Sequence, residues 1–269
     1  MLITNGPKRF RVQTKVMVTV NPTLNQLNQR RSVRAFTGEP VKPGDLQAIL
    51  AATQQAPSSI NGQQLSLIVV QDRERIAQIA KVAGGQPQVA GATVFVAFVV
   101  DFNRTAVAAE KAGFEQVIPR SAEGILTGAV DAGIALATFQ AAAGALGYGT
   151  TSIGGIRRNP AELIALLELP PLTYPIVGAI LGVPDEERLP QVKPRVPLES
   201  FAMPERYDAD LVAAGVRAYD QTLRSWWDAQ GLDQMPDYSK AVGTAYSTVY
   251  FPTVAATMRE QGFEFADEA

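Results

Sequence analysis

The stretch Arg30-Arg31-Ser32-Val33-Arg34-Ala35-Phe36-Thr37 places three arginines within five positions of a chain whose net charge is only -2. In a helical turn, this spacing would put Arg30 and Arg34 on one face. Guanidinium groups make paired hydrogen bonds with phosphate oxygens, so three of them beside a hydroxyl group suit a phosphate-binding site. A solvated basic turn is the competing interpretation, and composition alone slightly favours it.

The rest of the composition narrows the chemistry. The chain has 269 residues, of which 46% are hydrophobic and 19% charged, as in an ordinary soluble enzyme. It contains no cysteine and no histidine. This excludes disulfides, cysteine nucleophiles, cysteine-ligated iron–sulfur clusters, Ser-His-Asp triads and zinc sites that use histidine. A bound organic cofactor fits best, because it brings its own reactive atoms.

The charge and the hydropathy pattern also set expectations for partners. A net charge of -2 implies no general attraction to nucleic acid or to an anionic membrane. No apolar run reaches the length of a membrane span, and no signal-peptide core follows the basic residues near the N-terminus. A cytoplasmic location is therefore the default expectation.

A polar loop comes after the helix expected over residues 43–55. It contains Ser58, Ser59, Asn61 and Gln63, and a buried strand is expected over residues 65–70. Hydroxyl and amide side chains can bind phosphate or the polar edge of a ring. Taken alone, the loop is most simply a helix-to-strand turn, since Ser, Asn and Gly are common turn formers.

Further landmarks continue along the chain. A helix expected over residues 123–146 is apolar nearly all round, so it must be buried in a core or against another subunit. Its small residues permit close approach of a neighbouring element. The remaining landmarks are Gly84-Gly85-Gln86, a strand at 93–100 that leads into Asp101-Phe102-Asn103-Arg104, then Ile153-Gly154-Gly155, and the basic loop Lys193-Pro194-Arg195-Val196-Pro197.

The order of these landmarks resembles the FMN-dependent nitroreductase family over about residues 24–265. The family signature R-S-x-R-x-[FY] matches residues 31–36, and P-S-x-x-N-x-Q matches residues 57–63. The motifs G-G-Q, D-F-N-R and K-P-R-[LV]-P resemble the NfsA-type branch. No single motif is decisive, but together and in this order they are specific. The G-x-G-x-x-G fingerprint of a Rossmann dehydrogenase is absent.

The resemblance implies non-covalently bound FMN. The arginine stretch would meet the phosphate, the ribityl chain and the pyrimidine side of FMN, while paired glycines would let backbone N–H groups reach the N5 edge. Two later basic residues would complete the phosphate cage. No side chain is assigned a catalytic role, and no metal is expected. The residues that the resemblance assigns to FMN are Arg30, Arg31, Ser32, Arg34, Ser58, Ser59, Asn61, Gln63, Gln86, Ile153, Gly154, Gly155, Lys193 and Arg195.

The resemblance also implies an α+β fold, in which helices flank a mixed, mainly antiparallel central sheet, and a homodimer. We expect residues 1–20 to be an N-terminal arm and residues 21–269 to be one FMN-binding domain, with a helical extension from about residue 203. The implied reaction is two-electron, ping-pong hydride transfer from NAD(P)H, with NADPH preferred over NADH. The acceptors would be nitroaromatics, quinones or similar flat, small electrophiles.

Three alternatives remain open at this point. The protein could be a flavin reductase that supplies reduced FMN to a partner. It could be a non-catalytic FMN-binding protein. It could also be a soluble α+β domain whose arginines bind some other phosphate.

Overall fold

The computed structural model describes residues 21–267, so the N-terminal arm expected over residues 1–20 lies outside the described residues. The described residues divide into two compact units. One comprises residues 26–191 and 249–267, and the other comprises residues 21–25 and 192–248. The single FMN-binding domain expected over residues 21–269 stays a prediction.

The first unit is built on one antiparallel sheet with the strand order β1-β2-β4-β3. Every neighbouring pair is antiparallel, which confirms the expected α+β fold with an antiparallel central sheet. β1 and β3 are the two edges, and both expected cofactor segments adjoin an edge strand. The strands are β1 (Leu65–Val70), β2 (Val94–Asp101), β3 (Gly149–Ile153) and β4 (Thr173–Gly182).

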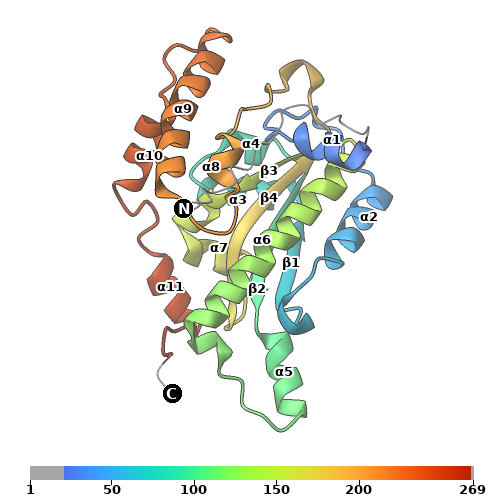
Figure 1. The fold of residues 1–269 in the computed structure, drawn as a ribbon. Coiled ribbons are helices and arrows are strands. Elements are labelled where there is room, and N and C mark those ends of the chain that lie inside the picture. The colour runs from blue at the N-terminus through green and yellow to red at the C-terminus, as the bar shows by residue number, and fades with distance from the viewer. Residues whose placement is uncertain (1–20, 268–269) are drawn as a thin grey trace, which may run out of the picture. The chain divides into compact units, whose positions relative to one another are not determined.

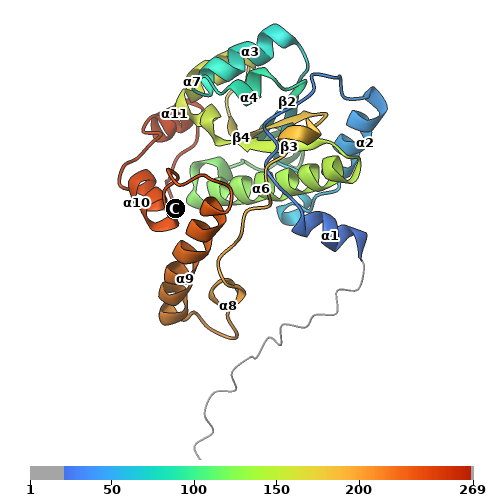
Figure 2. The same cartoon turned by 90° about the horizontal axis from the view of Figure 1, so that it is seen from above.

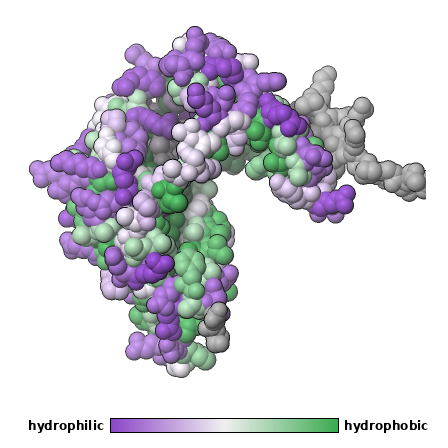
Figure 3. Space-filling model, turned by 90° about the vertical axis from the view of Figure 1, so that its left-hand side faces the viewer, coloured by the Kyte–Doolittle hydropathy of each residue, from purple (hydrophilic) through white to green (hydrophobic). Residues whose placement is uncertain are grey.

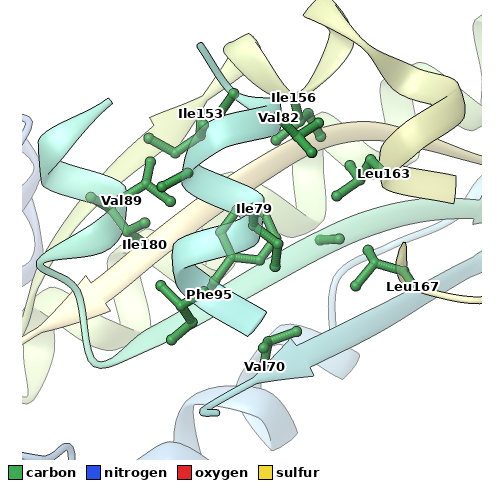
Figure 4. Close-up of a cluster of buried hydrophobic side chains, with 14 of the residues drawn as sticks. Val70, Ile79, Val82, Val89, Phe95, Ile153, Ile156, Leu163, Leu167 and Ile180 are labelled. Atoms are coloured by element: carbon green, nitrogen blue, oxygen red, sulfur yellow. The ribbon is translucent and has the colours of Figure 1, made fainter. Parts of the chain in front are cut away.

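Helices cover both faces of this sheet, as Figure 1 and Figure 2 show. The helices α3 (Arg73–Val82), α4 (Pro87–Ala90) and α7 (Pro160–Leu166) cover one face, where Phe95 and Ile180 join a buried cluster (Figure 4). The helices α2 (Pro43–Gln54) and α6 (Ala122–Ala145) cover the other face. The central strand β2 is buried on both faces, which explains its continuous apolar sequence.

Helix α6 confirms the apolar helix that was expected over residues 123–146. Ser121 caps its start by accepting a hydrogen bond from the Gly124 N–H (3.1 Å). The expectation that no apolar run reaches the length of a membrane span is wrong for α6 by length and composition, but one face of the helix packs into the sheet core through Ala132, Ala135 and Phe139. The opposite face exposes Leu126 (60%) and Val130 (57%). The described residues therefore cover only about half of this helix.

The remaining elements are short or lie outside the sheet. In the first unit, α11 covers one end of β4, because Met258 and Phe263 pack with Tyr174. Pro252 lies between α10 and α11, where its missing N–H cannot continue a helix. The elements outside the sheet and its covering helices are α1 (Pro22–Asn28), η1 (Ser59–Asn61), α5 (Asn103–Lys111), η2 (Ile118–Arg120), η3 (Gly154–Arg158), η4 (Glu186–Arg188), α8 (Leu198–Phe201), α9 (Ala209–Asp228), α10 (Tyr238–Tyr246) and α11 (Val254–Glu260).

The second unit has its own small core. Tyr219, Leu223 and Trp227 of α9 are buried there, and the ring of Tyr219 meets that of Tyr238 edge-on at 5.1 Å. Asp208 caps α9 by accepting from the N–H groups of Asp210 and Leu211. At the surface of the described residues, hydrophobic side chains gather in patches between hydrophilic ones, as the green areas of Figure 3 show.

Candidate functional site

The arginine stretch is extended, so the helical turn expected over residues 30–34 is wrong. The Val33 N–H donates to Thr150 O (3.0 Å), and Thr151 Oγ1 donates to Val33 O (2.6 Å). These bonds place the stretch alongside β3. Side chains alternate along an extended chain, so Val33 is buried while Arg34 is exposed. The burial of Val33 and these two hydrogen bonds together favour the extended form over a turn.

Two of the arginines line a cavity of about 430 Å³ beside the C-terminal half of α6. Arg30 is exposed, whereas Arg31 is half-buried and donates to Pro190 O (3.2 Å). Tyr148 lines the same cavity and donates its hydroxyl to the Asp45 carboxylate (2.7 Å). Partial burial and this hydrogen bond raise the pKa of Tyr148. Adjacent guanidinium groups at an open cavity can bind a phosphate.

The paired glycines follow β3, the strand alongside which the arginine stretch runs. A Cβ on Gly155 would overlap Gln86 Nε2 and lie 2.6 Å from Ala83 O, so only glycine fits there. Gln86 Nε2 donates to Ala83 O (3.0 Å), which holds the amide against this turn. The structure therefore brings Gln86 and Gly155 together. Ile153 points into the core, which leaves only its backbone for a ligand.

The second polar loop lies at the opposite edge of the sheet, before β1. Three of its residues that are not glycine adopt left-handed backbone angles: Ile60 (φ 49°), Asn61 (φ 57°) and Gln63 (φ 52°). Such angles are uncommon outside glycine, and they cluster at functional sites. Within the loop, Ser58 Oγ accepts from the Gln63 N–H (3.1 Å). The loop is thus a specific conformation, unlike the simple turn that its composition indicates.

The loop and the arginine stretch meet different parts of α6. The Ser59 N–H donates to both Asp131 carboxylate oxygens (3.2 and 3.3 Å), while the α6 residues that line the arginine cavity are Ala137, Gln140, Ala141 and Gly144. Six positions separate Asp131 from Ala137, the nearest of these residues, which is about 9 Å of helix at 1.5 Å per residue. The loop and the arginine cavity therefore meet α6 at different points along its length.

Lys193 and Arg195 belong to the unit formed by residues 192–248. The Lys193 ammonium group lies 4.8 Å from the ring centroid of Trp227 and 5.8 Å from that of Trp226. Arg195 donates to Lys193 O (3.0 Å) and Pro194 O (3.1 Å) of its own loop. The Tyr219 hydroxyl also donates to Pro194 O (2.9 Å), so this loop is fixed to α9. Their part in a phosphate cage stays a prediction.

Two polar contacts of the second loop were not expected from the sequence. The first is the contact with Asp131. A single carboxylate in an otherwise apolar helix is the sequence signal that could have marked Asp131 as a residue with a specific polar partner. Arg104 lies in the D-F-N-R run, which reads most simply as a strand end and turn, although Asn103 in fact begins α5. The guanidinium of Arg104 donates to Gln63 O and to Leu65 O.

Comparisons with known proteins agree with this architecture. The family model "Nitroreductase family" matches residues 27–183, and "Nitroreductase family, C-terminal domain" matches residues 193–266. An "FMN reductase [NAD(P)H]" of Bacillus subtilis is 40% identical over 248 residues, which cover 91% of this chain and 99% of that protein. An "Oxygen-insensitive NADPH nitroreductase" of Salmonella typhimurium is 34% identical over 225 residues, or 81% of this chain and 88% of that protein.

A solved structure shares the fold over nearly the whole chain. The structure of B. megaterium NfrA2 has a TM-score of 0.87 and 37% sequence identity, and the match covers 91% of this chain and 99% of that one. The family model spans both the arginine stretch and the paired glycines. This chain therefore belongs to the nitroreductase family.

Proposed function

We propose that this protein is an FMN-dependent NAD(P)H oxidoreductase that reduces nitroaromatics, quinones or similar flat electrophiles and prefers NADPH. The observation that carries the proposal is the family match over residues 27–183, within which the arginine stretch and the paired glycines both adjoin β3. The relatives named as an FMN reductase and as an NADPH nitroreductase support the same cofactors. We place the protein in the cytoplasm.

The residues present fit FMN. Arg30 and Arg34 are exposed at the edge of the sheet, where they can meet a phosphate, and Arg31 adds a third positive charge. Gly154 has no neighbour closer than 3.5 Å to an added Cβ, so a flat ring could approach its backbone closely. The side-chain amide of Gln86 lies against Gly155, the residue after Gly154, and can contact the edge of the flavin ring.

FMN supplies the electron chemistry when it is bound, by accepting a hydride from NADPH and passing two electrons to the acceptor. The protein's part is to orient the ring and to place cationic and N–H groups where negative charge develops. Nicotinamide and acceptor would share one open face and take turns there, which gives ping-pong kinetics. The chain has no histidine and no cysteine, so we assign the proton to solvent.

We further propose a homodimer whose two FMN sites each use both subunits. The exposed face of α6 carries Leu126, Val130, Gly133, Ala137 and Gly144, a stripe of apolar and small residues that lets a second helix approach closely. A two-fold axis crossing α6 between Asp131 and Gln140 would bring the partner subunit's second loop toward this chain's arginine stretch. The separation of about 9 Å between Asp131 and Ala137 along one α6 supports this arrangement.

An absorbance spectrum of the purified protein tests the proposed function. We expect flavin bands, FMN uptake by stripped protein, and steady NADPH oxidation with menadione or nitrofurazone as acceptor. Parallel double-reciprocal lines would support ping-pong kinetics. A colourless protein that FMN cannot reconstitute would overturn the proposal, and FMN binding without NADPH oxidation would leave a non-catalytic flavin-binding protein.

Light scattering tests the homodimer. Val130→Lys places a charge in the exposed stripe of α6 and should yield a monomer of about 28.8 kDa that no longer retains FMN. Val107→Lys, on the exposed face of α5, is the matched control and should remain dimeric. A monomeric wild type that retains FMN would refute the shared site.

The B. subtilis relative gives a specific reason to keep a flavin reductase as the second candidate, because it is named an FMN reductase. A flavin reductase releases reduced FMN, whereas a nitroreductase of the proposed kind keeps it. Gel filtration after reduction separates them: FMN that stays with the protein supports the first proposal, and FMN that elutes alone supports the second.

A further inference from the structure

The second loop needs outside support because it lacks glycine where glycine is favoured. Ile60, Asn61 and Gln63 carry the left-handed angles, while Gly62, the glycine among them, has an ordinary φ of -70°. A β-branched residue such as Ile60 is especially unfavourable in this region. Ile60 is 97% exposed, so its own side chain does not hold the loop by burial. Something else must fix this conformation.

Asp131 of α6 holds the start of the loop. Its side chain is 5% exposed, and its carboxylate accepts from the Ser59 N–H and from Gln64 Nε2 (2.7 Å). None of the ion pairs found in the described residues involves it. A buried carboxylate is costly unless hydrogen bonds compensate it, so these two donors define its place. Gln64 is itself buried, and a Cβ on Gly62 would overlap its Oε1.

Arg104 holds the end of the loop at the open edge of β1. Its Nη1 donates to Gln63 O and to Leu65 O (3.1 Å), two carbonyls two positions apart along the chain, and its Nη2 donates to Ser66 Oγ (3.4 Å). These carbonyls face away from β2, because Gln64 O, between them, accepts from the Asp101 N–H on the β2 side (3.1 Å). The two coplanar N–H groups of Nη1 suit this pair of acceptors while Nη2 reaches Ser66 Oγ, and a lysine, with a single nitrogen, offers no equivalent geometry.

Other residues of the D-F-N-R run fix the position of Arg104. Asp101 Oδ1 accepts from the Asn103 N–H (3.0 Å), which fixes the start of α5 one residue before Arg104. Asp101 Oδ2 accepts from Ser66 Oγ (2.6 Å), which links the run back to β1. Asp101, Asn103 and Arg104, together with Ser66, thus connect the end of β2 to the end of the loop.

The geometry points to Arg104 and Asp131 as positioning residues for cofactor binding: they hold the Ser58–Gln63 segment in its left-handed form without touching the cofactor themselves. This inference rests on the proposed function, in which Ser58, Asn61 and Gln63 face FMN. It also gives the D-F-N-R run a role in the reaction. Arg104 acts through two backbone carbonyls and the Ser66 hydroxyl, so its two donor nitrogens in one plane, rather than its positive charge, are the property that counts.

Hydrogen–deuterium exchange and FMN titration of the full-length protein test the inference together. Arg104→Gln should speed exchange across residues 58–64, change the visible circular dichroism of bound FMN, and raise its dissociation constant on the order of tenfold or more. Arg104→Lys should behave like Arg104→Gln. Full rescue by lysine would overturn the inference, because it would show that charge alone is needed. If the Asp131→Asn variant folds, it should change the same three measurements. If it does not fold, the Arg104 variants alone test the inference.

Arg73→Gln is the matched control, because Arg73 also donates to two backbone carbonyls, Ala92 O (2.7 Å) and Gly38 O (3.4 Å), outside the loop. It should leave exchange across the loop and the dichroism unchanged. Equal effects of Arg73→Gln and Arg104→Gln would reduce Arg104 to a structural residue and refute the inference. A wild type that binds no FMN overturns the proposed function and the cofactor role with it, whereas the exchange measurement still decides whether Arg104 holds the loop.

Discussion

The arginine stretch and the second loop flank opposite edges of one sheet, but different bonds hold them. Backbone bonds from Val33 to Thr150 and burial of the Val33 side chain keep the arginine stretch in a relaxed, extended form. The second loop has left-handed angles at three residues and depends on side chains 40 or more positions away, since Arg104 reaches Gln63 O across 41 residues. A relaxed segment tolerates loss of a side chain, whereas a strained one needs its supports.

Breaking the backbone support of the arginine stretch should have the largest effect. A Cβ on Gly149 would lie 2.6 Å from the Val33 side chain, so Gly149→Val should push the stretch off β3. We expect a stability loss of about 1–3 kcal/mol from overpacking, together with loss of FMN. Urea unfolding and FMN titration measure the two effects. Gly44→Val, where an added Cβ meets nothing within 4 Å, is the control and should change neither.

Removing an exposed arginine should weaken FMN binding and leave the fold intact. Arg34→Ala deletes a charge-assisted bond to the proposed phosphate, so binding should weaken by about 1.5–3 kcal/mol, or roughly ten- to a hundredfold. Stability should change by less than about 0.5 kcal/mol, as for most surface substitutions. Arg75→Ala on the exposed side of α3 is the matched control. Unchanged FMN affinity in Arg34→Ala would remove this residue from the site.

Glycine should have opposite effects in the two segments. At Ile60, glycine removes a left-handed penalty of roughly 1–2 kcal/mol and adds about 0.5–1 kcal/mol of unfolded-state entropy, for a net gain near 0.5–1 kcal/mol. At Thr37, in the extended segment, glycine relieves no backbone penalty. It adds the entropy cost and removes the Oγ1 that accepts a hydrogen bond from the Glu39 N–H (3.1 Å). Chemical denaturation of the two variants compares them. Destabilisation of equal size at both positions would mean that the loop is not strained.

Sequence patterns predicted what depends on neighbours in the chain. The apolar runs expected as strands over residues 65–70 and 93–100 and the apolar helix expected over residues 123–146 are local signals, and all three gave correct elements. The family motifs located both polar segments. The helical turn over residues 30–34 failed because the bonds from β3 lie about 118 positions away, as between Val33 and Thr151. The supports of the second loop were missed for the same reason.

A tyrosine beside the arginine cavity gives the smallest and most specific test. Tyr148 donates to Asp45 and accepts from the Lys42 N–H (3.2 Å), so Tyr148→Phe should lose about 1 kcal/mol near neutral pH. The folded protein raises the pKa of Tyr148, so this contribution to stability is full below the pKa of the unfolded state, near 10, and falls as pH rises through the pKa of the folded state.

Tyr174 is the control: burial raises its pKa to about 12, and its hydroxyl has no hydrogen-bond partner among the described residues. Tyr174→Phe should therefore cost little at neutral pH and should reduce the loss of stability between about pH 10 and 12. Unfolding curves from pH 7 to 12 compare the two variants. Equal losses at neutral pH would mean that the hydroxyl of Tyr148 does not support the arginine side of the sheet.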